Sequence, residues 1–228
     1  PIEGRNLKGV HFALELLSQQ NRILEGIVIP SKDIINCKGK KVLVIGGGDT
    51  GSDCVGTANR HKAASVTQIE IMPQPPVGHN PATPWPLYPQ VLKTSSSHEE
   101  GCIRRWNLAS VRFIGDKNTL KGVEVEEIEW QPTEKEGRPE MRKTGRTEVI
   151  EADLVFLAMG FIHPEQEGLV KELSLAVDAR GNIAVDPVTN QIADTNLFAS
   201  GDAVSGASLV VRAMASGRKV AAAIDQYL

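Results

Sequence analysis

The chain has 228 residues, of which 41% are apolar and 23% are charged, a composition typical of a globular protein rather than a disordered or fibrous one. It is longer than an average domain of roughly 150 residues, so we expect two lobes. A net charge of −3 at pH 7 provides no broad positive field, which disfavours nucleic acid and acidic membrane surfaces as partners.

The cysteines and the start of the chain indicate the cellular setting. Cys37, Cys54 and Cys102 are far apart and show no CxxC spacing, so we expect neither a disulfide framework nor a metal site. No apolar run approaches the length of about 18 residues that a membrane helix needs, and the first residue is not Met. We therefore expect a cytoplasmic protein without a membrane anchor, cut from a longer chain.

The first half of the chain predicts a β-turn-α-β unit. Residues 1–36 hold a short stretch of helical composition between glycine turns, which we interpret as a connector. The apolar run 42–45 predicts a buried strand that ends at a glycine-rich turn, and a helix is expected over 52–62. A second strand is predicted over 66–71, because Pro73 cannot donate a ladder hydrogen bond.

The middle of the chain begins with a stiff, extended loop, since residues 73–89 contain more than half of the 13 prolines. Ser96 and Ser97 stand three residues before Glu99 and Glu100, and this spacing predicts a capped helix start. An acid–base cluster around His98 is the alternative interpretation of the same segment, and the helix cap explains it better.

The remaining elements are predicted from alternation and apolar runs. Alternating apolar residues over 111–151 predict antiparallel strands, with a phase slip that indicates a bulge near Glu126 and a polar hairpin tip over 134–147. The run 153–158 predicts a central parallel strand. A strand and turn over 195–202 and a helix over about 209–224 complete the expectation.

The glycine-rich turn carries the first candidate site, a G-x-G-x-x-G pattern at Gly46, Gly48 and Gly51. Such a pattern alone is weak and an incidental glycine turn is the alternative, but here a strand precedes it, a helix follows it, and Glu70 lies about 20 residues downstream. We expect the glycines to allow a tight turn, close backbone approach to a pyrophosphate and close helix packing. The Asp49 carboxylate would repel phosphates unless it caps the helix, and we favour the cap.

The coenzyme is expected to be NADH rather than NADPH. No Lys or Arg lies between Lys62 and Lys93 to neutralise a 2′-phosphate, whereas Glu70 suits a free ribose hydroxyl. Arg60, Lys62, Arg104 or Arg105 could still reach the site from elsewhere, so the sequence leaves both coenzymes open.

A second candidate site follows the last expected strand, where Gly201 and Asp202 lead into a turn of small residues and a long helix. An ordinary strand-loop-helix corner with an Asp cap is the alternative. In the functional interpretation the Asp202 carboxylate accepts from a ribityl or ribose hydroxyl, and amides at Ser208, Leu209 and Val210 face the edge of a reduced flavin.

Several segments together resemble a known family: residues 46–54 (GGGDTGSDC), 71–76 (IMPQPP), 84–86 (PWP), 94–101 (TSSSHEEG) and 198–202 (FASGD). They are similar to the small (beta) subunit of glutamate synthase, over essentially the whole chain. The resemblance implies a Rossmann-like α/β fold of the two-dinucleotide-binding-domain flavoprotein type. It also implies a nicotinamide domain at 37–163, with a parallel sheet and a β-meander crossover, and the C-terminal part of an FAD-binding domain at 164–228.

The resemblance further implies cofactors, partners and site residues. Electrons would pass from NAD(P)H through FAD and iron-sulfur clusters to a large (alpha) subunit, where glutamine and 2-oxoglutarate become glutamate. The cluster-binding region and the first FAD fingerprint of the family are not found in this sequence, so residues 1–36 would be the tail of the first FAD half and the isolated chain would be inactive. Coenzyme contacts would come from Gly46, Gly47, Gly48, Asp49, Thr50, Gly51, Glu70 and Gly160, and flavin contacts from Gly201, Asp202, Ser208, Leu209 and Val210.

Two alternatives stay open at this point. A related electron-input unit could serve another acceptor, as in a sulfide or pyrimidine dehydrogenase, or the isolated chain could be only a dinucleotide-binding or docking module. The lack of CxxC argues against a dithiol relay of the thioredoxin reductase type.

Overall fold

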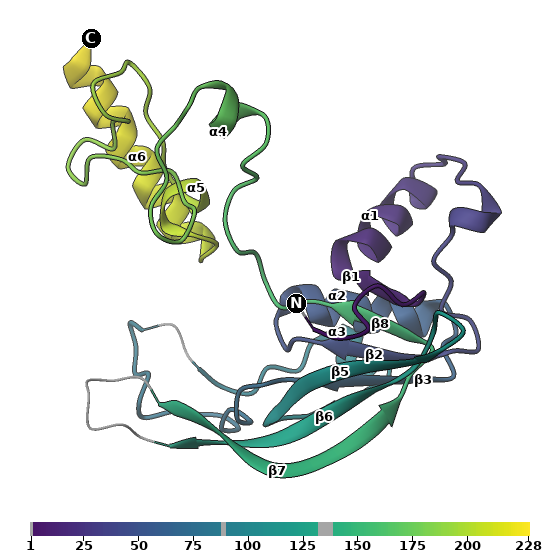
Figure 1. Cartoon of the computed structure of the whole chain (residues 1–228). Coiled ribbons are helices and arrows are strands. Elements are labelled where there is room, and N and C mark those ends of the chain that lie inside the picture. The colour runs from purple at the N-terminus through teal and green to yellow at the C-terminus, as the bar shows by residue number, and fades with distance from the viewer. Residues whose placement is uncertain (1, 88–89, 132–138) are drawn as a thin grey trace. The chain divides into compact units, whose positions relative to one another are not determined.

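The computed structural model describes residues 2–87, 90–131 and 139–228. The chain divides into two compact units, residues 1–159 and residues 160–228 (Figure 1).

The described part of the first unit contains two sheets and three α-helices. The elements of the parallel sheet are β1 (Val10–Phe12), β2 (Lys41–Ile45), β3 (Ser65–Ile69), β4 (Ile103–Arg105) and β8 (Leu154–Leu157). The antiparallel sheet contains β5 (Leu108–Asp116), β6 (Thr119–Gln131) and β7 (Glu140–Glu151). The helices are α1 (Ala13–Leu24), α2 (Asp49–Arg60) and α3 (Ser96–Glu99), with a 3-10 turn at Ser31–Asp33.

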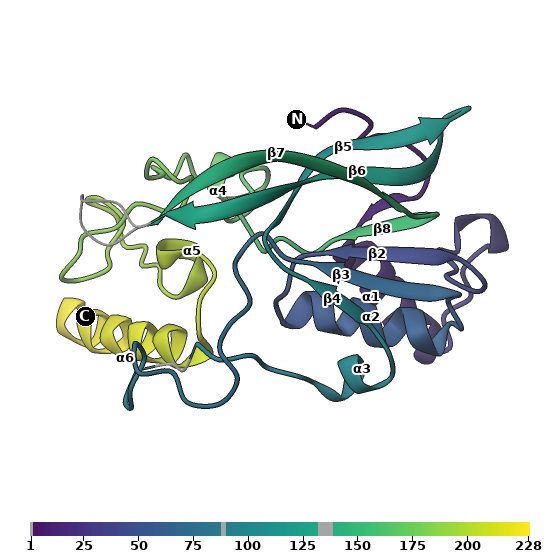
Figure 2. The same cartoon turned by 90° about the horizontal axis from the view of Figure 1, so that it is seen from below.

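The five-stranded sheet is parallel throughout, with the order β1-β8-β2-β3-β4, and both of its faces are covered. Along β2, Val42 and Val44 face α1 and α2, whereas Leu43 and Ile45 face the antiparallel sheet. Figure 2 shows these layers, with the helices on one side and β5, β6 and β7 on the other. Because both faces are buried, the strand is apolar at every position after Lys41, which is why the sequence predicted it. The predicted Rossmann-like α/β fold is confirmed.

The predicted central strand and the predicted bulge are both confirmed. β8 lies between β1 and β2, and its Phe156 side chain is fully buried. The register of β6 against β7 shifts between Glu126 and Ile128, as the phase slip indicated.

The predicted hairpin tip at 134–147 is wrong from residue 140 onward, because these residues belong to β7; residues 132–138 lie outside the described residues. Ladder hydrogen bonds and cross-strand ion pairs hold this polar strand instead of apolar burial. Lys143 lies 3.0 Å from Glu126, and Arg146 lies 2.8 Å from Glu127. Because β7 is held by charges and not by apolar side chains, its sequence lacks the apolar alternation by which a strand is predicted.

The N-terminal segment packs within the first unit. β1 pairs in parallel with β8, and α1 buries Ala13 and Leu16 against the sheet. Gln19 fixes the segment that follows, accepting from the Ile35 N–H at 2.8 Å and donating to the Ile35 carbonyl at 3.0 Å. The strand is only three residues long, so its pairing depends on β8 and leaves no local pattern.

The second unit contains α4 (Leu169–Glu172), α5 (Asp202–Ser205) and α6 (Val210–Tyr227). Its small core consists of Val170, Ile183 and Ile192. The predicted long helix is confirmed as α6. The predicted strand at 195–202 is wrong, because among the described residues this segment makes only an isolated bridge between Gln191 and Phe198. Local turns satisfy its backbone instead, as in the 2.8 Å bond from the Ile192 N–H to the Leu197 carbonyl.

Candidate nucleotide-binding site

The glycine turn after β2 is closely packed against its neighbours. Gly46 has a φ of +121°, and a Cβ there would lie 2.2 Å from the Ala158 carbonyl oxygen. Its N–H donates to the Ile69 carbonyl at 2.9 Å, which ties the turn to β3. A Cβ at Gly51 would lie 2.3 Å from the Gly46 carbonyl oxygen, so the first turn of α2 packs directly on the turn. The expected tight turn and close helix packing are therefore present.

The N-terminus of α2 offers unpaired amides. The first intrahelical bond runs from the Ser52 N–H to the Gly48 carbonyl at 3.0 Å, so the amides of Asp49, Thr50 and Gly51 have no intrahelical partner. A Cβ built at Gly48 would meet no atom within 4 Å, which leaves the approach to these amides open. The expected Asp49 cap is not formed: Gly48 is the N-cap residue and makes no side-chain cap bond, while Asp49 is the first helical residue.

Glu70 lies beside the glycine turn, where the strand-turn-helix pattern places it. Its Oε2 accepts from the Gly47 N–H at 2.5 Å, and its Oε1 accepts from the Met72 N–H at 3.1 Å. The carboxylate therefore connects the glycine turn to the segment that follows β3. The expected hydrogen bond from a ribose hydroxyl to Glu70 stays a prediction.

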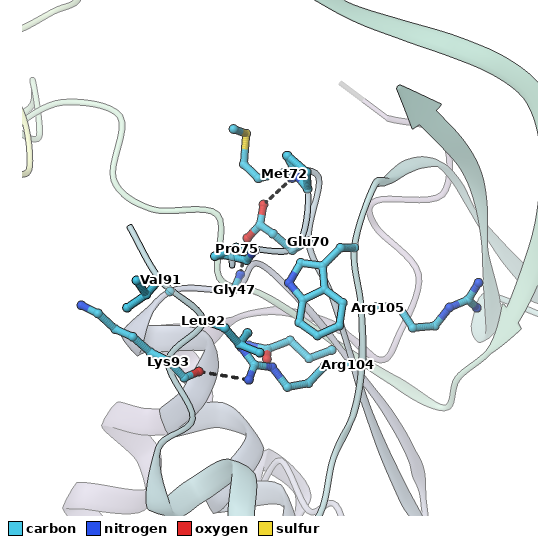
Figure 3. A pocket seen from close by; sticks show the side chains of 13 residues that line it. Gly47, Glu70, Met72, Pro75, Val91, Leu92, Lys93, Arg104 and Arg105 are labelled. Atoms are coloured by element: carbon cyan, nitrogen blue, oxygen red, sulfur yellow. Dashed lines mark hydrogen bonds between the residues drawn. The ribbon is translucent and has the colours of Figure 1, made fainter. Parts of the chain in front are cut away.

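A pocket of about 320 Å³ opens next to this turn. Gly47 and Gly48 line one side of it, and residues from the ends of β3 and β4 and from segment 91–93 line the rest. Figure 3 shows Glu70, Lys93 and Arg104 around it. Ligands of open parallel sheets bind at the carboxyl ends of the strands, and this pocket lies at the ends of β3 and β4.

A partly buried chain of hydrogen bonds connects α3 to the glycine turn, and sequence analysis missed it. The Ser95 N–H donates to His98 Nδ1 at 3.2 Å, and His98 Nε2 lies 2.9 Å from Gln68 Oε1. Gln68, which is 2% exposed, then donates from Nε2 to the Gly46 carbonyl at 2.9 Å. Because Nδ1 accepts from a backbone amide, a neutral His98 carries its proton on Nε2. Burial, helped by Arg104, lowers the pKa of His98.

The predicted helix start near residue 96 is confirmed, but its cap differs from the expectation. Ser95 is the N-cap residue of α3, and His98 occupies the third helical position, where its ring accepts from the cap N–H. Ser96, Ser97, Glu99 and Glu100 do not form the capping box. Glu100 pairs with Arg60 on α2 instead. The only sequence signal was the Ser-x-x-His spacing, since the Gln68 contact spans 30 residues.

The second unit contains the other predicted site residues, which the structure places as follows. Gly160, with a φ of +87°, is its first residue and does not line the pocket. Gly201, with a φ of +64°, precedes α5, and Asp202 Oδ1 accepts from the Ser208 N–H at 3.3 Å. Leu209 is the N-cap residue of α6, and Val210 begins the helix. Asp202 and the segment 208–210 are thus brought together within this unit.

Two of the three cysteines, Cys37 and Cys54, are buried. Burial raises the pKa of Cys37 to about 11 and that of Cys54 to about 12, so both stay protonated thiols near neutral pH. Within the described ranges, no cluster of three or more His, Cys, Asp or Glu side chains is arranged to hold a metal ion. In the same ranges, every helix is too short or too polar to cross a bilayer.

The doubly covered parallel sheet, the glycine turn and the open start of α2 define a dinucleotide-binding domain of the Rossmann type. The chain belongs to the pyridine nucleotide-disulphide oxidoreductase family, whose model matches residues 90–217, more than half of the chain.

Relatives support the resemblance to glutamate synthase small subunits. The chain is 42% identical over 232 residues to the glutamate synthase [NADPH] small chain of Mycobacterium tuberculosis, covering 100% of this chain and 46% of that one. It is 37% identical to glutamate synthase [NADH] of Schizosaccharomyces pombe, covering 99% of this chain and 11% of that one. This chain thus spans less than half the length of either relative.

Solved structures agree on the fold. FprA of Mycobacterium tuberculosis, determined in complex with NADPH, superimposes with a TM-score of 0.68 at 14% identity and covers 99% of this chain and 60% of that one. At this identity the likeness concerns the fold alone.

Proposed function

We propose that this chain is the electron-input portion of a glutamate synthase, which accepts hydride from NAD(P)H and passes it to FAD. The observation that carries the proposal is the open start of α2. The amides of residues 49–51 make no hydrogen bond to the described residues, and Gly47 and Gly48 just before them line a pocket at the ends of parallel strands. The names of the relatives, glutamate synthase [NADPH] small chain and glutamate synthase [NADH], support the same reaction class.

In this proposal the turn over 46–51 holds the pyrophosphate of the coenzyme. The amides of Asp49, Thr50 and Gly51 donate to the phosphate oxygens, and the positive end of the α2 dipole stabilises their negative charge. Glu70 stands where the adenosine ribose meets the end of β3. Gly160 flanks the path of the nicotinamide.

The second unit would contribute part of a flavin site. Asp202 has one carboxylate oxygen, Oδ2, that makes no hydrogen bond to the described residues and is available to a ribityl or ribose hydroxyl. Of the amides expected at the flavin edge, that of Ser208 already donates to Asp202. The amides of Val210 and of the next residue, Val211, precede the first hydrogen bonds of α6 and are available to an electron-rich ring edge. This donor and acceptor set fits FAD, whose isoalloxazine accepts hydride when bound.

The later steps are proposed from the resemblance alone. Electrons would continue through iron-sulfur clusters to a large subunit that makes glutamate from glutamine and 2-oxoglutarate, in the cytoplasm. A related unit that serves another acceptor is the second candidate, because the described residues include none that would select the acceptor.

The test uses the full-length flavoprotein that contains this chain, mixed anaerobically with NADH or NADPH while flavin absorbance is followed. Gly48→Val places a branched side chain in the open approach to α2, and Ala64→Val is a matched surface control. We expect saturable bleaching in the wild type and the control, and a loss of coenzyme affinity of about tenfold or more in Gly48→Val. Unchanged kinetics in Gly48→Val would refute the proposed coenzyme site.

A further inference from the structure

The pocket beside the glycine turn has more positive charge than the sequence order suggested. No basic residue follows β3 directly, but β4 pairs with β3 and brings Arg104 and Arg105 to the same end of the sheet. Lys93 lines the pocket from the preceding segment. Glu70 is the single acidic residue among the lining residues.

Glu70 and Arg105 are both engaged with other parts of the protein. Both oxygens of Glu70 accept backbone N–H bonds, from Gly47 and Met72, which offsets part of its negative charge. Arg105 donates from Nη1 to Glu148 on β7 at 3.0 Å and from Nη2 to the other oxygen of the same carboxylate. Figure 3 shows the Arg105 side chain extending away from the pocket.

Arg104 differs from Arg105 because its guanidinium is held in place at one end only. Its Nη1 donates to the Lys93 carbonyl at 3.0 Å, as Figure 3 shows, and lies 3.5 Å from the Thr94 hydroxyl. Its Cζ lies 5.2 Å from the centroid of the Trp106 ring, within cation–π range. Nε and Nη2 of Arg104 make no hydrogen bond to the described residues. The guanidinium is therefore half-buried and held in position, and it still has N–H donors available to an anion.

We propose that Arg104 recognises the 2′-phosphate of NADPH in this pocket and is the residue that selects NADPH over NADH. This inference rests on the proposed function, because it requires the adenosine ribose to lie at the end of β3. A phosphate monoester carries about −1.5 to −2 charges at neutral pH. The fork of an arginine matches it geometrically, and Lys93 adds a second positive charge. The absence of basic residues between Lys62 and Lys93 therefore does not determine the choice of coenzyme.

The experiment compares two small probes with the chain: 5′-AMP, and 2′,5′-ADP, which differs from it only by the 2′-phosphate. Binding is measured by isothermal titration calorimetry for the wild type, Arg104→Gln, Arg104→Lys and Arg105→Gln. Arg105→Gln is the matched control. It removes the same positive charge at the neighbouring position, but from a guanidinium that is already bound to Glu148.

We expect the wild type to bind 2′,5′-ADP about tenfold or more tightly than 5′-AMP, which corresponds to one charge-assisted hydrogen-bonded contact. Arg104→Gln abolishes that preference and leaves 5′-AMP affinity within about twofold, Arg104→Lys keeps part of it, and Arg105→Gln keeps it. No preference in the wild type, or an equal loss in Arg105→Gln, overturns the inference while the coenzyme site stands. Failure of both probes to bind any variant overturns the proposed function as well.

Discussion

The two candidate sites of this chain begin with the same local pattern, a glycine of positive φ followed by an aspartate that starts a helix. They differ in the contacts that hold the glycine in place. Gly46 is surrounded by backbone and a buried amide: the Ala158 carbonyl, the Ile69 carbonyl and Gln68. At Gly201 the N–H donates to Ser216 Oγ at 3.2 Å, and the carbonyl accepts from the Ser205 hydroxyl at 3.0 Å. A sheet with both faces covered fixes the first turn, whereas the second turn depends on local contacts.

The cores of the two units differ in the same way. In unit 1, two clusters bury both faces of the parallel sheet, whereas the core of unit 2 consists of Val170, Ile183 and Ile192 with a few partly buried neighbours. Among the residues of α6 only Val220 is buried, and Met214 is 64% exposed. We infer that unit 1 holds its site preformed, while the site of unit 2 is weakly supported by the unit itself.

The largest expected effect comes from removing a core side chain of unit 1. Phe156→Ala should lower the free energy of unfolding of unit 1 by about 3–5 kcal/mol, because its ring is fully buried. Hydrogen exchange followed by mass spectrometry should show faster exchange across β2, β3 and β8, with unit 2 unchanged. Faster exchange in unit 2 to the same degree would show that the two cores are one cooperative structure.

The second prediction compares the two glycine turns directly. Gly46→Ala should lower the free energy of unfolding by about 3 kcal/mol or more. The new Cβ would lie 2.2 Å from the Ala158 carbonyl oxygen, and the positive φ of this position adds backbone strain. Gly201→Ala should lower the free energy of unfolding by only about 1–2 kcal/mol. Its φ of +64° strains an alanine, but the nearest atom to the new Cβ, Ala213 Cβ, lies at 3.5 Å. Urea unfolding of the variants measures both, and equal losses would contradict the comparison.

The third prediction concerns the hydrogen-bond chain under the glycine turn. The pKa of His98 in the folded chain lies below its ordinary value of 6.5, because burial disfavours the charged ring. Its stabilising contribution is therefore fully present above pH 6.5 and is lost as the pH falls through the lowered pKa. We expect coenzyme affinity to fall about threefold to tenfold as the pH falls from 6.5 through the lowered pKa. A proton on Nδ1 of His98 removes the acceptor of the Ser95 N–H hydrogen bond.

Two variants isolate this effect. His98→Gln should have lower affinity at neutral pH and a flat pH dependence. His61 also has a pKa lowered by burial, but its ring contacts Gln20 on α1, so His61→Gln should retain the pH dependence of affinity. Coenzyme titrations at a series of pH values would refute the role of His98 if both variants behaved alike.

The smallest expected effect is at the ion pair between β4 and β7. Glu148→Gln should lower the free energy of unfolding by at most about 1 kcal/mol, because both side chains are partly exposed and solvent screens the pair. The Arg105 side chain lowers the pKa of Glu148, so this contribution is lost as the pH falls through that lowered pKa. Thermal unfolding with and without salt provides the measurement, and a loss of several kcal/mol would contradict this assignment.

The parts of the fold that sequence analysis predicted correctly are those determined by local patterns. β2, the glycine turn and α2 follow each other without a break, and the apolar run of β8 marks a strand buried on both faces. Glu70 could be placed beside the turn because the spacing within a β-turn-α-β unit is nearly constant.

The parts it missed depend on distant pairing. β1 is a strand only because β8 lies beside it, and the polar strand β7 is held by charges on β6. Gln68 and His98 meet across 30 residues, and Arg104 reaches the pocket only because β4 pairs with β3. No local periodicity carries this information, so these contacts could not be predicted from one sequence.

The most direct test of the central claim is a titration of the isotope-labelled chain with NADPH, followed by NMR of the backbone amides. The account predicts saturable shifts at Asp49, Thr50 and Gly51, because these amides would bond to the pyrophosphate. Saturable binding that leaves these three amides unshifted, or no saturable binding at all, would contradict it.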